Sequence, residues 1–281
     1  GPAFVKLGQA LSVRPDLVGD ELADDLTSLQ DDLPAFDGSD ARAAIAAELG
    51  RPVDDLFASF DDTAIAAASI AQVHKAVTPD GDTVAIKVLR PGIEAAFARD
   101  LELARWAAYR FENLRPDLRR LRPVEAVNTI IRSVEIEMDL RFEAAAADEL
   151  RENFDGDPTF SVPAVDWLRT GRRVMTTAWI DATPMNDLNA DALGPDRETI
   201  VANFARAFFL QVFRDGFFHA DLHPGNIFVD DDGVIHAVDF GIMGRLDRRT
   251  RQYLAEMLHG FLTGDYRRVA DVHIRAGYVP A

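Results

Sequence analysis

An aspartate, an asparagine and a second aspartate are spaced so that one hairpin can bring them together. Asp221 and Asn226 lie in the run His-Ala-Asp-Leu-His-Pro-Gly-Asn, and Asp239 opens an Asp-Phe-Gly triplet. Residues 227–229 and 234–238 flank the turn Asp-Asp-Asp-Gly, which predicts a β-hairpin whose ends meet. Because Mg²⁺ prefers oxygen ligands, Asn226 and Asp239 are predicted metal ligands, and Asp221 can orient or deprotonate an attacking hydroxyl. The alternative, an acidic turn with loop-capping side chains, is disfavoured by this spacing.

A lysine upstream has the surroundings of a phosphate-binding residue. Lys87 ends the run Val-Ala-Ile-Lys within the apolar strand pattern 83–89. Its ammonium can reach the α- and β-phosphates of ATP, although a lysine at a sheet edge explains the run equally well. The expected helix 123–153 offers these carboxylates as its partner: Glu135, Glu137, Asp139 and Glu143. Asp139 and Glu143 share a face of that helix, and we expect Glu143 to pair with Lys87.

The segment before this strand has alanine where kinases have a glycine-rich loop over the phosphates. Ala66, Ala68 and Ala71 occupy the three glycine positions, with Ser69 between them. The added methyl groups restrict positive φ and close approach, so we expect these residues to position nucleotide differently from a glycine loop. On composition alone, an alanine-rich helix start is favoured. Trp179 is a candidate to border the adenine, and core packing explains it as well.

The elements that must position these residues follow an α+β pattern with two lobes. Helices are expected within residues 1–60, among them 41–49, with Ser39 or Asp40 capping its start and Gly50 its end. The remaining expected elements are a hairpin of 72–77 and 83–89 turning at Asp80-Gly81, helices 93–113 and 123–153, strands 160–165 and 173–180, a helix 196–215 ending at Gly216, the hairpin described above, and closing helices.

Composition excludes several classes of protein and site. The chain has 281 residues and no cysteine, so disulfides, thiolate metal sites and cysteine nucleophiles are excluded. Its formal charge of −17 disfavours nucleic acid and anionic lipid as partners, and the densest basic segment, 115–122, is interpreted as a solvated helix end. No signal peptide is expected from the residues given, and no apolar run approaches the ~20 residues of a membrane span. We expect a cytoplasmic domain cut from a longer protein, with no nucleic-acid partner.

Together these residues resemble the UbiB/AarF family of atypical kinase-like proteins. The K-x-G-Q motif of that family corresponds to Lys6 and Gln9 with the residues between them, and its E-x-D motif to Glu137 and Asp139. The alanine-rich loop also matches, and the resemblance spans nearly the whole chain. It implies a two-lobed protein-kinase-like fold with ATP and Mg²⁺ as cofactors. The implied parts are a helical extension in 1–60, an N-lobe in 61–180 and a C-lobe in 181–281 that is truncated.

The resemblance also implies restricted access to the site. Lys6 and Gln9 would occlude the cleft and contact Glu137 or Asp139, so the expected activity is that of an ATPase or a small-molecule or lipid kinase. The implied role is support of ubiquinone or other isoprenoid-quinone biosynthesis, or lipid homeostasis. A lipid or quinone precursor is the expected partner, with membrane association of the full-length protein through segments missing here. Ala220 replaces the usual kinase arginine, which argues against control by activation-loop phosphorylation.

Two alternatives remain open at the level of sequence. The run from His219 to Asn226 also resembles the loop of aminoglycoside and choline kinases, which would make the protein a small-molecule phosphotransferase. A nucleotide-sensing pseudokinase that scaffolds other enzymes is the second alternative. His219 and His223 are not expected to form a metal pair, because proline and glycine follow them. His219 is instead expected to pack against the segment around Asp239.

Overall fold

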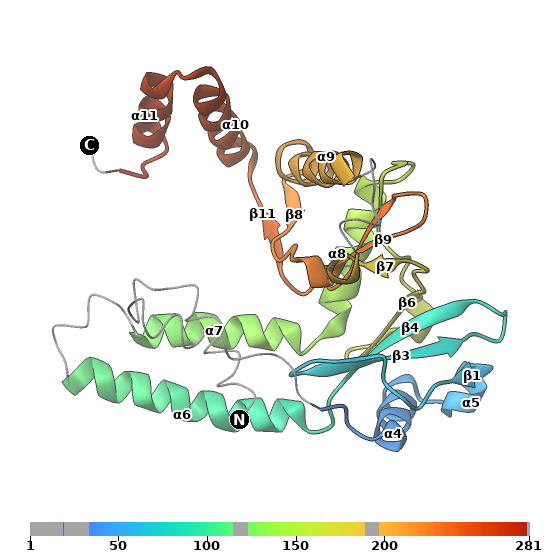
Figure 1. Cartoon of the computed structure of the whole chain (residues 1–281). Coiled ribbons are helices and arrows are strands. Elements are labelled where there is room, and N and C mark those ends of the chain that lie inside the picture. The colour runs from blue at the N-terminus through green and yellow to red at the C-terminus, as the bar shows by residue number, and fades with distance from the viewer. Residues whose placement is uncertain (1–18, 20–33, 115–122, 189–196, 280–281) are drawn as a thin grey trace. The chain divides into compact units, whose positions relative to one another are not determined.

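The structure, a computed structural model, describes residues 19, 34–114, 123–188 and 197–279 (Figure 1). The predicted residues Lys6 and Gln9 and the basic segment 115–122 lie outside the described residues. The described part of the chain divides into two compact units. Unit 1 contains the described residues up to Ala144 together with Val165–Trp179, and unit 2 contains Ala145–Ala164 with those from Ile180 onward.

Unit 1 is built on a five-stranded antiparallel sheet in the order β1-β3-β4-β6, with β2 beside β3 (Figure 1). Its strands are β1 (Ser59–Phe60), β2 (Ala66–Ala67), β3 (Ala71–Val77), β4 (Thr83–Leu89) and β6 (Val174–Ala178). The predicted hairpin of β3 and β4 is confirmed, and Gly81 in its turn has φ 97°. Glycine adopts such a positive φ without steric cost, as the Asp80-Gly81 signal predicts.

Helices pack against this sheet and extend from it. They are α4 (Gly38–Leu49), α5 (Val53–Leu56), α6 (Ile93–Leu114), α7 (Pro123–Glu137), the 3₁₀ turn η2 (Trp167–Arg169), and the start of α8 (Leu140–Asn153), which continues into unit 2. The start of α4 differs from the prediction, because Asp37 is its N-cap and accepts a hydrogen bond from the Ser39 amide at 2.7 Å. Aspartate and serine are equally good N-caps, so the sequence alone could not show that Asp37, and not Ser39 or Asp40, caps this helix. Gly50 ends the helix in the left-handed conformation, as expected.

Alternation along β4 separates the core of unit 1 from Lys87. Val84, Ile86 and Val88 are at most 4% exposed and pack in one cluster with Ile45 of α4. Burying each such side chain contributes about 1.5–3 kcal/mol relative to leaving it exposed. Since successive side chains of a strand point to opposite faces, Lys87 projects from the face of the sheet opposite this core.

The predicted helix 123–153 is wrong in one respect, because it is two helices. α7 ends at Glu137, and α8 begins at Leu140. The Leu140 amide donates to the carbonyl of Arg172 at 2.8 Å instead of to a carbonyl one helical turn back. A contact so distant in sequence leaves no mark on helical periodicity. The assumed i, i+4 relation of Asp139 and Glu143 on one helix therefore does not hold.

Unit 2 combines a four-stranded sheet in the order β5-β10-β9-β7, a two-stranded sheet β11-β8, and helices. The strands are β5 (Phe160–Ser161), β7 (Thr183–Pro184), β8 (Phe217–His219), β9 (Ile227–Val229), β10 (Ile235–Ala237) and β11 (Met243–Arg245). The helical elements are α9 (Arg197–Phe209), the π-helical turn η5 (Leu210–Asp215), α10 (Arg248–Thr263), α11 (Tyr266–Arg275), and the 3₁₀ turns η3 (Met185–Asp187) and η6 (Pro224–Asn226).

Three features of unit 2 differ from the sequence prediction. The strand predicted at 160–165 is reduced in this unit to β5, while Val165 belongs to unit 1 and forms an isolated bridge with Thr177. The helix predicted at 196–215 changes to π geometry at Leu210 before ending at Gly216, whose φ is 66°. The pairing of β11 with β8 was not predicted. The hairpin of β9 and β10 is confirmed, and the helix and strand content of both units confirms the α+β class.

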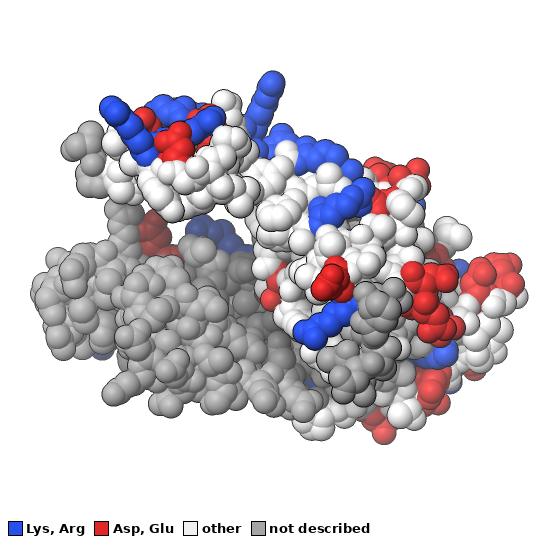
Figure 2. Space-filling view, turned by 45° about the horizontal axis from the view of Figure 1, so that its top comes forward, with Lys and Arg blue, Asp and Glu red and all other residues white. Residues whose placement is uncertain are grey.

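Charge on the surface is mixed over the C-terminal helices. Figure 2 shows blue side chains, which are arginines in this part of the sequence, gathered over α10 and α11, with Asp and Glu among them. Arg275 of α11 is paired with Glu256 of α10 at 2.5 Å, and Arg268 lies 4.0 Å from the same carboxylate. Within the described ranges, no helix is both long enough and apolar enough to cross a bilayer.

Candidate active site

Lys87 of unit 1 is paired with Glu143 from the first turn of α8. The lysine Nζ lies 2.7 Å from Oε1 and 2.9 Å from Oε2 of the carboxylate, so it bonds both oxygens. The two side chains are 20% and 9% exposed. Shielding from water strengthens a charge-assisted contact of this kind, which restricts the long lysine side chain to one direction. Glu143 is thus the partner that the sequence analysis expected, and the catalytic role of the pair stays a prediction.

The alanine-rich segment is a strand, a turn and a second strand. Ala66 pairs with Val73 and Ala67 with Gln72, and the Ala68 amide donates to the Ala71 carbonyl at 2.8 Å. The helix start that composition alone favoured is wrong, because pairing with β3 outweighs helix propensity. We call residues 66–73 the alanine hairpin. Its Ser69 is 1% exposed, and its hydroxyl oxygen has no hydrogen-bond partner in the described part of the chain.

In unit 2, the register of β9 and β10 brings Asn226 and Asp239 to the same end of one hairpin. Ile227 pairs with Ala237, and the Val238 amide donates to the Asn226 carbonyl at 2.9 Å. The Asn226 side-chain amide donates to the backbone carbonyl of Asp221 at 3.1 Å. The segments that carry Asp221, Asn226 and Asp239 are therefore adjacent within this unit, and the convergence of the three side chains and their roles in chemistry stay predictions.

His219 connects the two segments that carry the aspartates. The Asp221 amide donates to its Nδ1 at 3.1 Å, so Nδ1 carries no proton and Nε2 donates to the Val238 carbonyl at 3.1 Å. Its ring lies 5.6 Å from that of Phe240, and it is 1% exposed. His219 therefore packs against the Asp239 segment, as expected. His223 has a local task, since its Nδ1 accepts from the Gly225 amide and caps η6.

Asp239 has an unusual backbone conformation. Its φ is 59°, a positive value shared by no other non-glycine residue among those described. Such a conformation is strained by about 1–3 kcal/mol and persists where the surroundings impose it. The buried Phe240, 3% exposed, anchors the chain immediately after it. At Gly241, an added Cβ would lie 3.3 Å from Oδ1 of Asp239, so the absence of a side chain leaves room for the carboxylate.

The donor set of this hairpin fits Mg²⁺ bound through few protein ligands. Because Nδ2 of Asn226 is used by the Asp221 carbonyl, Oδ1 is the part of that amide able to ligate a cation. Asp239 is exposed and supplies carboxylate oxygens. Among the described residues, no three His, Cys, Asp or Glu side chains gather as an all-protein metal cage. Mg²⁺ commonly binds through one or two side-chain oxygens together with phosphates and water, so these residues fit it.

The E-x-D residues lie at the end of α7 and in the break that follows. Asp139 is bound by Arg141, with contacts of 2.6 and 2.8 Å to its two carboxylate oxygens. The hydrogen bonds from Arg141 hold the pKa of Asp139 below its ordinary value, although partial burial acts in the opposite direction. Glu137 is half-buried. Contacts of either carboxylate with Lys6 or Gln9 involve residues outside the described ranges, and this part of the prediction stays untested.

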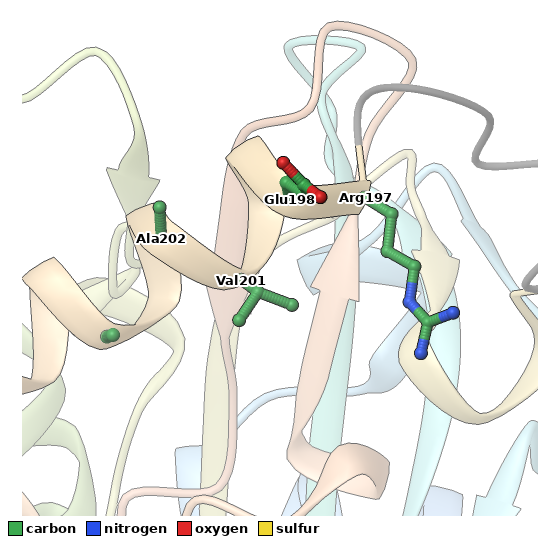
Figure 3. Close-up of a pocket in the computed structure, with 5 residues that line it drawn as sticks. Arg197, Glu198, Val201 and Ala202 are labelled. Carbon is green, nitrogen blue, oxygen red and sulfur yellow. The ribbon is translucent and has the colours of Figure 1, made fainter.

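Two further features concern possible ligand surfaces. Trp179 follows β6, and the ammonium of Lys75 lies 4.2 Å from its ring centroid, so one face of the indole is covered. A shallow pocket of about 440 Å³ lies along α9 and is lined by Arg197, Glu198, Val201, Ala202 and Ala205. Figure 3 shows Arg197 and Val201 on one side of this helix and Glu198 and Ala202 on the other. None of these pocket residues belongs to the predicted site.

Sequence reasoning missed three polar residues that support the candidate site. Arg90 donates from Nε and Nη2 to the Ala68 carbonyl, and Gln72, in the second strand of the alanine hairpin, is 1% exposed. Gln211, 0% exposed in the π turn, accepts from the His219 amide at 2.9 Å. A signal for the two glutamines was available. Each stands in an otherwise apolar stretch at a position that alternation or helical spacing turns inward, where a polar side chain requires partners.

Comparison with known proteins identifies the family. Residues 28–273 match the ABC1 atypical kinase-like domain. The chain belongs to that family. It is 44% identical over 285 residues to a protein of Marinobacter nauticus described as a probable protein kinase UbiB, and 42% identical over 287 residues to one of Xylella fastidiosa with the same description. Each match covers 100% of this chain and 52% of the relative, so the chain spans about half the length of these relatives.

A solved structure supports the fold of this family member. The chain superposes with a TM-score of 0.72 on Rv3197 of Mycobacterium tuberculosis, solved in complex with erythromycin, at 28% sequence identity. The match covers 97% of this chain and 68% of that protein. The resemblance to the UbiB/AarF family and the kinase-like α+β fold class are both confirmed. The predicted boundaries at residues 60 and 180 stay predictions.

Proposed function

We propose that the chain is an atypical kinase or ATPase of the UbiB type, which binds ATP with Mg²⁺ and supports isoprenoid-quinone biosynthesis or lipid homeostasis. The observation that carries this proposal is the bidentate pair of Lys87 and Glu143. A lysine so restrained on the open face of β4 is the device by which kinases bind the α- and β-phosphates. Membership of the ABC1 family, with relatives described as probable protein kinases, supports the same reading.

Each predicted residue has a stated role in this proposal. Asp239 and Asn226 ligate Mg²⁺, which when bound would neutralise charge on the phosphates. Asp221 accepts the proton of, or orients, the attacking hydroxyl or water. Lys87 binds phosphate oxygens and Glu143 positions it. The alanine hairpin, with Ala66, Ala68, Ser69 and Ala71, covers the phosphates, and the buried hydroxyl of Ser69 offers a donor. Trp179 borders the adenine with the ring face that Lys75 does not cover.

Restricted access to the site is part of the proposal. Lys6 and Gln9 would occlude the cleft by contact with Glu137 or Asp139, which excludes a protein substrate and leaves ATP hydrolysis or a small or lipid acceptor. Lys6→Ala should then raise basal ATP turnover, whereas Arg51→Ala, at an exposed arginine that contacts no described residue of the proposed site, should not. Equal turnover of wild type and Lys6→Ala would contradict the occlusion. A cytoplasmic location, with membrane association through segments outside this chain, remains a prediction.

The function is tested by a Mg²⁺-dependent ATPase assay with and without anionic vesicles and quinone-headgroup analogues. Turnover that rises with lipid or headgroup analogue and is lost in Asp239→Asn would support the proposal. ATP binding without hydrolysis under every condition would favour a nucleotide-sensing scaffold instead. Absence of Mg²⁺-dependent ATP binding would contradict both.

A small-molecule phosphotransferase is the second candidate, and one observation favours testing it. The structure of the relative from Mycobacterium tuberculosis is a complex with erythromycin, a hydroxyl-bearing macrolide. A panel of macrolides, aminoglycosides and choline analogues should therefore be included in the same assay. Stoichiometric phosphorylation of one compound would establish this alternative, whereas phosphate release independent of the panel favours the first proposal.

A further inference from the structure

The side chain of Gln72 binds the backbone of a segment distant in sequence. Its Oε1 accepts from the Phe36 amide at 2.8 Å, and its Nε2 donates to the Phe36 carbonyl at 3.2 Å. The second Nε2 proton is directed to Nε2 of His74 at 2.7 Å, while Nδ1 of His74 donates to the Asp61 carbonyl at 2.8 Å. Every donor and acceptor of the Gln72 amide is thereby used, and the orientation of the amide is determined. Gln72 bonds Phe36 as a neighbouring strand would.

Arg90 links the ring of Phe36 to the turn of the alanine hairpin. The Arg90 guanidinium is 5.7 Å from the Phe36 ring centroid, within the range of a cation–π contact. It donates from Nε at 3.0 Å and from Nη2 at 2.8 Å to the carbonyl of Ala68, in the turn of the hairpin. The backbone adds a third link, since the Arg90 amide donates to the Ile70 carbonyl at 2.9 Å. One guanidinium therefore contacts both the hairpin turn and Phe36.

We infer that Phe36, Gln72 and Arg90 form a clamp that couples the segment ending at Phe36 to the shape of the alanine hairpin. Alanine has fewer accessible φ values than glycine, so the turn has few alternative conformations. A small number of contacts from outside the turn can therefore select one of them. Arg90 supplies that restraint on the turn, and Gln72 extends it to the chain before α4. Arg90 is on this view a positioning residue. Its effect on nucleotide affinity rests on the proposed function, whereas its effect on the hairpin does not.

The clamp is tested by two measurements on the same variants. Hydrogen exchange of peptides covering residues 66–71, without nucleotide, reports the hairpin itself, and titration with ATP and ADP reports its consequence. Arg90→Lys keeps the charge but loses the two-pronged contact with Ala68. Phe36→Leu keeps the apolar volume and the backbone bonds to Gln72 but removes the ring face, which Phe36→Tyr retains. Arg51→Lys is the matched control, because Arg51 also donates to a backbone carbonyl, that of Asp55 at 3.0 Å.

Arg90→Lys should speed exchange in the hairpin and weaken nucleotide binding, each about tenfold. Phe36→Leu should change both about threefold, and Phe36→Tyr and Arg51→Lys should leave both unchanged. Because the contacts act in series, the double variant Arg90→Lys with Phe36→Leu should be no worse than Arg90→Lys alone. Additive effects, or an Arg90→Lys profile equal to that of Arg51→Lys, would overturn the clamp. If wild type bound no nucleotide while exchange responded as stated, the proposed function would fail and the coupling would stand.

Discussion

The alanine hairpin of unit 1 and the hairpin of β9 and β10 in unit 2 are organised in opposite ways. In the second hairpin, the groups proposed to do chemistry are side chains, Asn226 and Asp239, and backbone register places them. In the alanine hairpin, the groups proposed to face nucleotide are mainly backbone and methyl groups. The Arg90 side chain, from outside the turn, bonds the Ala68 carbonyl, and the Gln72 side chain joins the hairpin to Phe36.

This difference predicts how each hairpin responds to substitution. Where a carboxylate or amide oxygen is the working group, its removal leaves nothing to replace it, and the loss should be near complete. Where a backbone conformation is the working feature, several restraints share the task, and each substitution should give a graded loss. The following predictions test that contrast, beginning with the largest effect.

Asp239→Asn should lower Mg²⁺-dependent nucleotide binding or turnover at least about 100-fold, because it removes the charge of a proposed metal ligand. Isothermal titration with ATP, with and without Mg²⁺, measures this. The matched control is Asp231→Asn, at an exposed aspartate in the turn of the same hairpin. Equal loss in both variants would show that the hairpin responds to charge in general and would refute the assignment of Asp239.

Glu143→Gln should lower turnover about tenfold and change ATP affinity less, because glutamine still accepts a bond from Lys87 but no longer carries the opposite charge. Steady-state kinetics separates the two effects. Glu135→Gln serves as control, since Glu135 is an exposed carboxylate of α7 and one of the four candidates that the sequence offered. If Glu135→Gln were the more damaging change, the contact with Lys87 would not be the one that matters.

Ala68→Gly should alter nucleotide affinity or selectivity by a few fold, because glycine releases the restriction on φ at the residue that Arg90 contacts. Parallel titrations with ATP and ADP measure the change. Ala64→Gly is the control, because it adds the same backbone flexibility outside the positions Ala66, Ala68 and Ala71. It measures the general effect of replacing alanine by glycine in this part of the chain. Identical titrations for Ala68→Gly and wild type would count against a special role of alanine.

The smallest effect concerns pH and His74. Burial lowers the pKa of His74 below its ordinary 6.5, outweighing Asp61 and Asp62, while Arg42 acts in the same direction as burial. A proton on its Nε2 would also oppose the Gln72 donor. The unfolded chain binds a proton at His74 more readily than the folded chain does. The contribution of His74 to the free energy of unfolding is therefore full above about pH 6.5 and falls as the pH drops below that value. Chemical unfolding of wild type between pH 7.5 and 5.5 should show this fall, and His74→Gln should show less of it. An equal pH dependence of both proteins would contradict it.

The sequence predicted well those elements that are fixed by interactions between residues close together in the chain, and it predicted poorly those fixed by distant contacts. Hairpin turns, the left-handed Gly50 and the adjacency of the segments that carry Asn226 and Asp239 follow from neighbours a few residues apart. The break between α7 and α8 depends on a bond from Leu140 to Arg172, and the start of α4 on a choice among several good caps. The expected pairing of Glu143 with Lys87 is correct although the continuous helix assumed for it is not.

By itself the sequence indicated the family through its motifs and the α+β class through its strand and helix patterns. It also predicted the β9–β10 hairpin that carries Asn226 and Asp239, because turn residues and alternation encode a hairpin locally. Only the tertiary structure decided that the alanine segment is a hairpin and not a helix start. The physical reason is that pairing of β2 with β3 and the bonds from Arg90 to the Ala68 carbonyl satisfy its backbone, and Arg90 comes from outside the hairpin. Local propensity is weak beside such contacts, which form only when distant parts of the chain meet.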